Sequence, residues 1–72
     1  MEIEQRLAER VRKFRTEQKL SQEELAHRAG LHRTFISQIE RATKRTTIRS
    51  TAQVAKALGV TMGDLLDGNR ER

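Results

Sequence analysis

Four side chains with hydrogen-bonding groups fall on one face of a short segment in the middle of the chain. If residues 33–41 form a helix at about 100° per residue, the four share an arc of about 140° and the apolar residues lie opposite. They are Arg33, Thr34, Ser37 and Gln38. An arginine can give two parallel N–H bonds to guanine, a glutamine can pair with adenine, and a threonine methyl can touch thymine. This face could therefore read base edges, or it could be an ordinary solvated helix face.

A block of positive charge follows this face. The chain has 15 Lys and Arg against 10 Asp and Glu, a formal charge of +5. Residues 41–56 alone contribute +5, because they hold five basic residues and no acidic one. Such a block is either solvated or the footprint of a polyanion. Its members that flank the segment could contact a sugar-phosphate strand: Arg41, Lys44, Arg45 and Arg49.

The composition argues against several other classes of protein. Cys, Trp and Tyr are absent, which removes disulfides and thiolate chemistry. His27 and His32 have no Cys or helical carboxylate partners for a metal site, and we expect no cofactor. No Ser/His/Asp grouping, Gly-rich phosphate loop or paired-carboxylate cleft indicates an enzyme. No stretch approaches the roughly 20 apolar residues that cross a bilayer. We therefore expect a cytoplasmic protein with no membrane partner.

The spacing of apolar residues predicts an all-α fold, since they recur every three or four positions and proline is absent. A first helix should run from about residue 4 to 18. Its narrow apolar stripe consists of Ile3, Leu7, Val11 and Phe14. Ser21 and Glu24 form a capping box that begins a second helix at Gln22, and Gly30 is suited to end that helix. The third helix is the segment 33–41.

Two further helices are predicted toward the end of the chain. Thr46 and Thr47 supply an N-cap for a fourth helix that Gly59 ends. Its apolar arc consists of Ile48, Ala52, Val54, Ala55 and Leu58. Thr61 caps a short fifth helix that carries Met62, Leu65 and Leu66. With no linker or repeat, residues 1–72 should form a single domain.

Residues 22–41 place a short helix, a glycine turn and another helix in series, which is the helix-turn-helix arrangement. This arrangement needs a small residue where the two helices touch, and Ala26 supplies it. The sequence resembles the phage-repressor and Cro-like regulators, the xenobiotic-response-element family, over residues 7–66. The motifs that carry the resemblance are RVRKFR, SQEELAHRAG, ISQIER and VAKALGV.

Within that family, LHRTFISQIER followed by TTIRS looks most like the controller proteins of restriction-modification systems. Three residues depart from the family's pattern. His32 stands where an Asp or Ser cap is usual, and Ala42 stands where a Gly usually ends the recognition helix. Thr51 replaces a usual Leu within the apolar arc of the fourth helix. We expect the Thr51 hydroxyl to bond to the carbonyl of Thr47, because a buried hydroxyl without a partner is costly.

The resemblance implies a compact five-helix lambda-repressor-like domain from a bacterium or phage, with its helix-turn-helix in the second and third helices. It supports base contact most strongly for Arg33 and Thr34. It also implies that Gln22 binds a phosphate and that Arg15 pairs with Glu40 for stability. The protein would bind a palindromic double-stranded DNA operator as a homodimer, with RNA polymerase as a candidate further partner. The dimer contact would lie at about residues 60–67, on Met62, Leu65 and Leu66.

Three hypotheses for the function follow from these patterns. The first is a dimeric, sequence-specific DNA-binding transcriptional regulator. The second is an antitoxin-type protein of the same fold that also binds a toxin, although such a protein usually needs a further toxin-wrapping segment and only six residues follow Leu66. The third is a helical adaptor that binds protein alone. An adaptor has no reason to gather base-reading side chains opposite the apolar face of the third helix.

Overall fold

The computed structural model describes residues 3–43 and 45–66, and all regular secondary structure in these residues is helical. Five helices follow one another along the chain: α1 (Ile3–Glu17), α2 (Gln22–Ala29), α3 (Arg33–Glu40), α4 (Ile48–Leu58) and α5 (Met62–Leu66). The predicted all-α class and the order of the helices are confirmed. The predicted ends of the first and third helices differ from the observed ones by a single residue.

Local sequence sets both ends of α2 and α4. The Ser21 hydroxyl accepts a hydrogen bond from the Glu24 backbone N–H at 2.9 Å, and the Glu24 carboxylate accepts one from the Ser21 N–H at 2.8 Å. Thr47 caps α4 by accepting from the Ser50 N–H at 3.0 Å. Gly30 and Gly59 then end the two helices in the left-handed conformation, with φ of 72° and 73°. Glycine adopts this conformation without strain.

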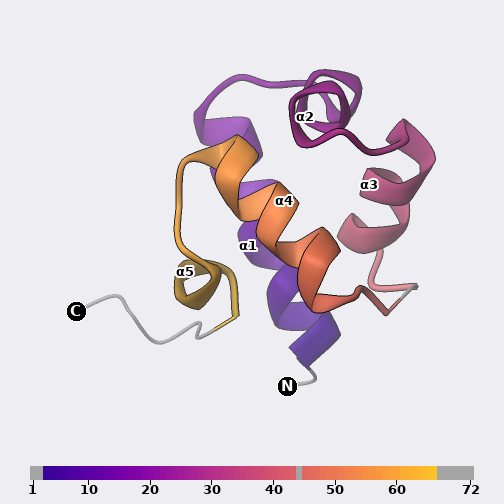
Figure 1. Ribbon diagram of the computed structural model, residues 1–72, viewed down its shortest axis with the longest axis vertical. Coiled ribbons are helices and arrows are strands. Elements are labelled where there is room, and N and C mark those ends of the chain that lie inside the picture. Colours follow the sequence, from indigo (N-terminus) through magenta and orange to yellow (C-terminus); the bar gives the residue numbers. More distant parts are fainter. Residues whose placement is uncertain (1–2, 44, 67–72) are drawn as a thin grey trace.

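The core receives side chains from all five helices. The largest fully buried residues are Val11, Leu25, Ile36, Ile39, Val54 and Leu65. Each such burial stabilises the fold by roughly 1.5–3 kcal/mol. Helix α3 packs on both α1 and α2, whereas α5 packs on α1 and α4. Figure 1 shows α3 and α5 on opposite sides of the crossed α1 and α4. One side of the molecule therefore holds the helix-turn-helix and the other holds α5.

Some members of the predicted apolar stripes are not buried. Ile3 is 51% exposed and Ile48 is 79% exposed, and Ala52 is exposed as well. Periodicity identifies the apolar face of a helix but not how far neighbouring helices extend along it. Thr51 is buried in α4, and its hydroxyl donates to the Thr47 carbonyl at 2.9 Å. This hydrogen bond is the one expected from the sequence.

Candidate DNA-binding site

Helix α3 has one buried and one accessible side. Ile36 and Ile39 are 0% and 2% exposed and anchor the helix in the core. On the other side Arg33 and Thr34 are exposed, and Ser37 and Gln38 are half-buried. The two most accessible side chains belong to the N-terminal turn, which is the part of a recognition helix that contacts base edges in the major groove. The arrangement can present two parallel guanidinium donors together with hydroxyl and amide groups to a groove.

The turn between α2 and α3 is fixed by hydrogen bonds. The Leu31 N–H donates to the Ala26 carbonyl at 2.9 Å across Gly30. From α4, the Gln53 side-chain amide donates to the Ala29 carbonyl at 3.1 Å. These bonds satisfy carbonyls at the end of α2 that have no partner within the helix. The Gln53 bond also ties the turn to α4, so the angle between α2 and α3 does not depend on the turn alone.

The C-terminal end of α3 is held by an ion pair with α1. Arg15 donates to the Glu40 carboxylate twice, from Nε to Oε2 at 2.6 Å and from Nη2 to Oε1 at 3.0 Å. The side chains are 15% and 2% exposed. Arg15 Nη1 also donates to the Leu20 carbonyl at 2.8 Å. Such a two-bond pair fixes geometry as well as charge, because both groups are planar.

Gln22 lies at the first position of α2 and joins the same cluster. Its side-chain Nε2 donates to Glu40 Oε1 at 3.1 Å, and the residue is half-buried. The resemblance implies a phosphate contact for this side chain. In the structure one of its amide donors is already used within the protein, so a phosphate would have to be met by the other.

The predicted phosphate-binding residues differ in their surroundings. Arg41 and Arg49 are exposed. Arg45 is also exposed, over 93% of its side chain, and its Nε lies 3.7 Å from the Glu4 carboxylate. Exposed ion pairs of this kind contribute about 0–1 kcal/mol, so a phosphate could replace Glu4 at little cost. Lys44 lies outside the described residues.

The backbone leaves α3 through a residue that is unusual for its conformation. Ala42 has φ of 57°, in the left-handed region that favours glycine. Its N–H donates to the Ile39 carbonyl at 3.0 Å, and the Thr43 N–H donates to the Gln38 carbonyl at 3.1 Å. The helix therefore ends with the same type of turn as α2, although no glycine is present. The sequence alone did not predict how α3 ends, because Ala42 stands where a Gly is usual.

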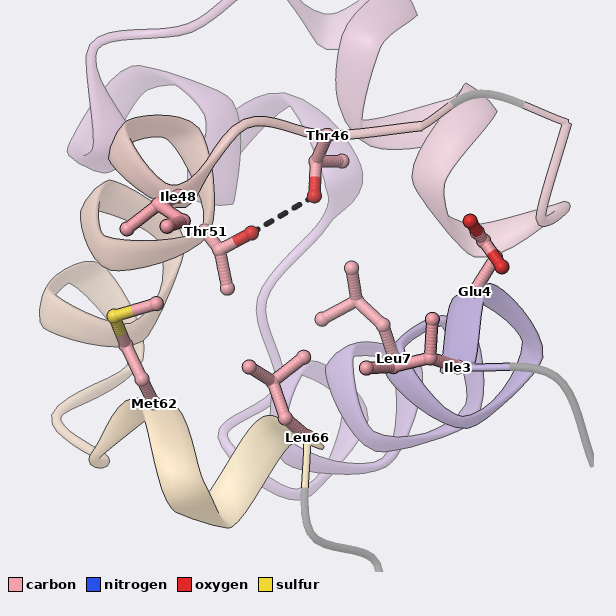
Figure 2. Close-up of a pocket in the computed structure, with 8 residues that line it drawn as sticks. All are labelled: Ile3, Glu4, Leu7, Thr46, Ile48, Thr51, Met62 and Leu66. Carbon is pink, nitrogen blue, oxygen red and sulfur yellow. Dashed lines mark hydrogen bonds between the residues drawn. The ribbon is translucent and has the colours of Figure 1, made fainter.

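Helix α5 presents a second, apolar surface. Leu65 is 0% exposed and belongs to the core, so it is not accessible for the contact that the sequence predicts, whereas Met62 and Leu66 are only partly buried. Together with Ile3 and Ile48 they form what we call the apolar patch. The patch borders an open cavity of about 180 Å³ that Leu7 and Thr51 also line (Figure 2). The Thr46 and Thr51 hydroxyls in its wall bond to each other at 2.8 Å, which leaves a mainly apolar surface.

Several arginines of α1 have structural contacts that sequence reasoning missed. Arg12 Nη2 donates to the Glu40 backbone carbonyl at 3.2 Å, at the end of α3. Arg6 Nη1 and Arg10 Nε donate to carbonyls of α5, at 3.2 Å to Leu66 and 2.9 Å to Asp64. No pattern in the sequence distinguishes these residues from solvated arginines, because their partners lie 28 to 60 positions away. The sequence pattern also did not predict that Ile3 and Ile48 lie on the surface, because it placed both in the apolar stripes of their helices.

Features typical of metal or membrane proteins do not occur in residues 3–43 and 45–66. No group of His, Cys, Asp or Glu in these residues could hold a metal ion, and His27 and His32 are both exposed. None of the helices described is long and apolar enough to cross a bilayer.

Comparison with known proteins gives the family. Residues 11–65 match the family model described as helix-turn-helix. The chain is 44% identical over 66 residues to control protein C.SmaI from Serratia marcescens, covering 92% of this chain and 79% of the relative. It is 45% identical over 60 residues to control protein C.BamHI from Bacillus amyloliquefaciens, covering 82% and 74%.

Solved structures agree with the sequence matches. The restriction-modification controller protein C.AhdI from Aeromonas hydrophila superposes with a TM-score of 0.83 at 31% identity, covering 86% of this chain and 94% of that one. The hypothetical transcription factor NHTF from Neisseria gives a TM-score of 0.88 at 38% identity, covering 90% of this chain and 75% of that one. The chain belongs to the helix-turn-helix family. It is a DNA-binding transcriptional regulator of the xenobiotic-response-element type and not an enzyme.

Proposed function

We propose that this protein binds a palindromic DNA operator as a homodimer and serves as the controller of a restriction-modification system. The observation that carries the proposal is the division of one small domain into two surfaces. The accessible side of α3 bears Arg33 and Thr34, whereas Met62 and Leu66 of the apolar patch belong to α5, which lies across α1 and α4 from α3 (Figure 1). The first surface can read bases and the second can join two copies.

Base reading is assigned to the accessible side of α3. Arg33 is the first exposed long donor on this side and suits the O6 and N7 atoms of a guanine. Arg33→Ala should weaken specific binding by roughly 1–3 kcal/mol and flatten the preference at one position of each half-site. Binding to random DNA serves as the control. An equal loss on specific and random DNA would contradict the assignment.

Affinity without sequence reading is assigned to the basic residues after α3. Among residues 3–43 and 45–66, Arg45 is held by its exposed pair with Glu4, so it can exchange this carboxylate for a phosphate. Arg45→Ala should weaken binding to all DNA alike and reduce the slope of log affinity against log salt by about 0.9. An unchanged salt dependence would remove Arg45 from the set of phosphate ligands.

Affinity and geometry support the proposal of a dimer. One domain of this size offers a single recognition helix, too little for the roughly 10⁻⁸ to 10⁻¹¹ M affinity of specific regulators. Recognition helices of a two-fold dimer lie about 34 Å apart, so each must be about 17 Å from the axis. The domain measures 30 × 23 × 19 Å, and α5 lies across it from α3. A two-fold contact through the apolar patch fits this spacing.

Sedimentation of substituted proteins tests the dimer contact. Leu66→Glu should give folded monomers that bind the operator weakly, because it places a charge in the patch. Ile48→Glu should do the same, since Ile48 is 79% exposed and contributes little to the core. Leu65→Glu is the matched control, which should unfold the protein because Leu65 is fully buried. Folded dimers of both patch variants would place the contact elsewhere.

The controller role rests on the similarity to the control proteins C.SmaI and C.BamHI and to C.AhdI. The regulator would act by occupancy, blocking a promoter or recruiting RNA polymerase according to where the operator lies. Selection of bound fragments from random DNA is the experiment that tests binding and symmetry together. A palindromic consensus upstream of restriction-modification genes supports the proposal. A consensus without symmetry would contradict the homodimer.

A further inference from the structure

The Glu40 carboxylate accepts one more side-chain hydrogen bond than its ion pair with Arg15 supplies. The two bonds from Arg15 already join α1 to the end of α3. The additional bond comes from Gln22, at the opposite end of the helix-turn-helix, where Nε2 donates to Glu40 Oε1 at 3.1 Å. A carboxylate oxygen can accept more than one donor, so the Arg15 and Gln22 bonds do not compete. A buried acid at the end of α3 therefore fixes a side chain at the start of α2.

The bond leaves part of the Gln22 amide available. A glutamine amide carries two N–H donors in one plane, and only one of them is needed for the Glu40 bond. The residue is half-buried, so solvent or a ligand can still reach it. A side chain ordered in the free protein loses less conformational entropy when it binds. The amide is thus prepared to make a second hydrogen bond.

The surrounding charge is compatible with a phosphate. An isolated carboxylate would repel DNA, but Arg15 neutralises Glu40, and Arg12 lies 3.8 Å from the same Oε1 atom. The two guanidiniums and one carboxylate give this cluster a net charge of +1. The first helix of a helix-turn-helix crosses the DNA backbone, and Gln22 is the first residue of α2.

We infer that Glu40 is a positioning residue for DNA binding: it orients the Gln22 amide so that the second N–H meets a backbone phosphate. The inference rests on the proposed DNA contact of this face. It assigns Glu40 a role beyond stability, because the acid that joins α1 to the recognition helix also sets where α2 meets the strand.

A double-mutant cycle tests the coupling. Arg15→Met with Glu40→Leu replaces the ion pair by apolar groups, a change that proteins often tolerate. Gln22→Ala should weaken DNA binding about three- to tenfold in the parent, as expected for one lost hydrogen bond, and less than about twofold in the apolar background. Arg45→Ala is the control and should have the same effect in both backgrounds. Equal losses for Gln22→Ala in the two backgrounds would overturn the inference.

Two further measurements separate the possible failures. If Gln22→Ala has no effect in the parent while Arg33→Ala and Arg45→Ala do, the inference fails and the proposed function stands. If none of the three substitutions weakens binding, the proposed DNA-binding face is wrong. Should the apolar variant not fold, side-chain ¹⁵N relaxation of the parent decides. The Gln22 amide should be ordered before DNA is added and the exposed Gln5 mobile, and equal mobility of the two would overturn the inference.

Discussion

Helices α2 and α3 have eight residues each and form one motif, yet their ends are stabilised in different ways. α2 begins with the Ser21 and Glu24 capping box and ends at Gly30. The N-cap residue of α3 is His32, whose side chain makes no capping hydrogen bond within the described part of the chain, and the backbone leaves α3 through Ala42 with φ of 57°. The supporting helix has favourable residues at both ends, and the recognition helix does not.

The difference shows what holds the recognition helix in place. Eight residues are too few for a helix to be stable alone, so both helices depend on packing. For α3 that packing consists of Ile36 and Ile39 in the core and of Arg12 and Arg15 on Glu40. Its position is thus set mainly by tertiary contacts on its buried side and at its last turn. The first turn, with Arg33 and Thr34, is accessible for DNA.

The largest expected effect comes from breaking the contact that holds the end of α3. Glu40→Ala leaves Arg15, which is 15% exposed, without its carboxylate. The free energy of unfolding should fall by about 3–5 kcal/mol, as for other buried pairs that lose one partner. Chemical denaturation measures it, with the exposed Glu17→Ala as the control. Equal denaturation midpoints for these two variants would show that α3 does not depend on this contact.

Placing a glycine after α3 and an alanine after α2 should change the stability of the protein in opposite directions. Ala42→Gly should stabilise the protein by about 1 kcal/mol, because glycine relieves the left-handed strain. Gly30→Ala should destabilise it by a similar amount. An added Cβ at Gly30 would meet the Gln53 side chain at 3.7 Å, an ordinary contact, so its cost is conformational rather than steric.

Lys19 gives an independent check of this exchange. It also has a positive φ, of 60°, but it lies between α1 and α2 and away from α3. Lys19→Gly should raise the melting temperature about as much as Ala42→Gly does. If Ala42→Gly lowers the melting temperature while Lys19→Gly raises it, the exit of α3 is not strained in the way proposed.

The sequence predicted those features that depend on neighbouring residues. The capping box at Ser21 and the glycine ends at Gly30 and Gly59 require only local geometry, and the structure contains all of them. The hydrogen bond from Thr51 to Thr47 could also be predicted, because a threonine hydroxyl in a helix reaches the carbonyl four positions earlier. The helix-turn-helix could be placed from its spacing for the same reason.

Features that depend on distant parts of the chain could not be predicted in this way. The exposure of Ile48 depends on where α1 and α5 end relative to α4, and helical periodicity does not contain that information. The bond from Gln22 to Glu40 spans 18 positions, and the bond from Arg6 to α5 spans 60. The sequence also could not show that Leu65 is buried and Leu66 only partly so, because this depends on how α5 packs on its neighbours.

Supplying α3 with the cap that α2 has should reduce the difference between the two helices. His32 has φ of −76° and ψ of 145°, the extended conformation of an N-cap residue. His32→Ser should therefore stabilise the protein by about 0.5–1 kcal/mol, and Ser21→Ala should destabilise it by about 1 kcal/mol. Thermal denaturation measures both. No gain from His32→Ser would indicate that the first turn of α3 is already fully satisfied.

The smallest expected effect is the loss at acid pH of the stabilisation that the Glu24 charge gives to the start of α2. The backbone N–H of Ser21 bonds to the Glu24 carboxylate, and this bond is the main cause that lowers the carboxyl pKa from the ordinary 4.5. Desolvation opposes the shift, and smaller contributions from the Ser21 hydroxyl and Arg28 add to it. Because the folded-state pKa lies below the unfolded one, this stabilisation is fully present above the unfolded pKa. It is lost as the pH falls through the folded value.

Glu24→Gln separates this charge effect from the hydrogen bond itself. A glutamine oxygen can still accept from the Ser21 N–H, but the side chain does not titrate. The parent should therefore be the more stable protein at pH 7, and the difference in melting temperature should close below about pH 4. The two proteins differ only at residue 24, so the change reports on the start of α2, whereas α3 has no acidic residue in its first turn. A difference that persists unchanged at acid pH would mean that the Glu24 charge does not stabilise the start of α2.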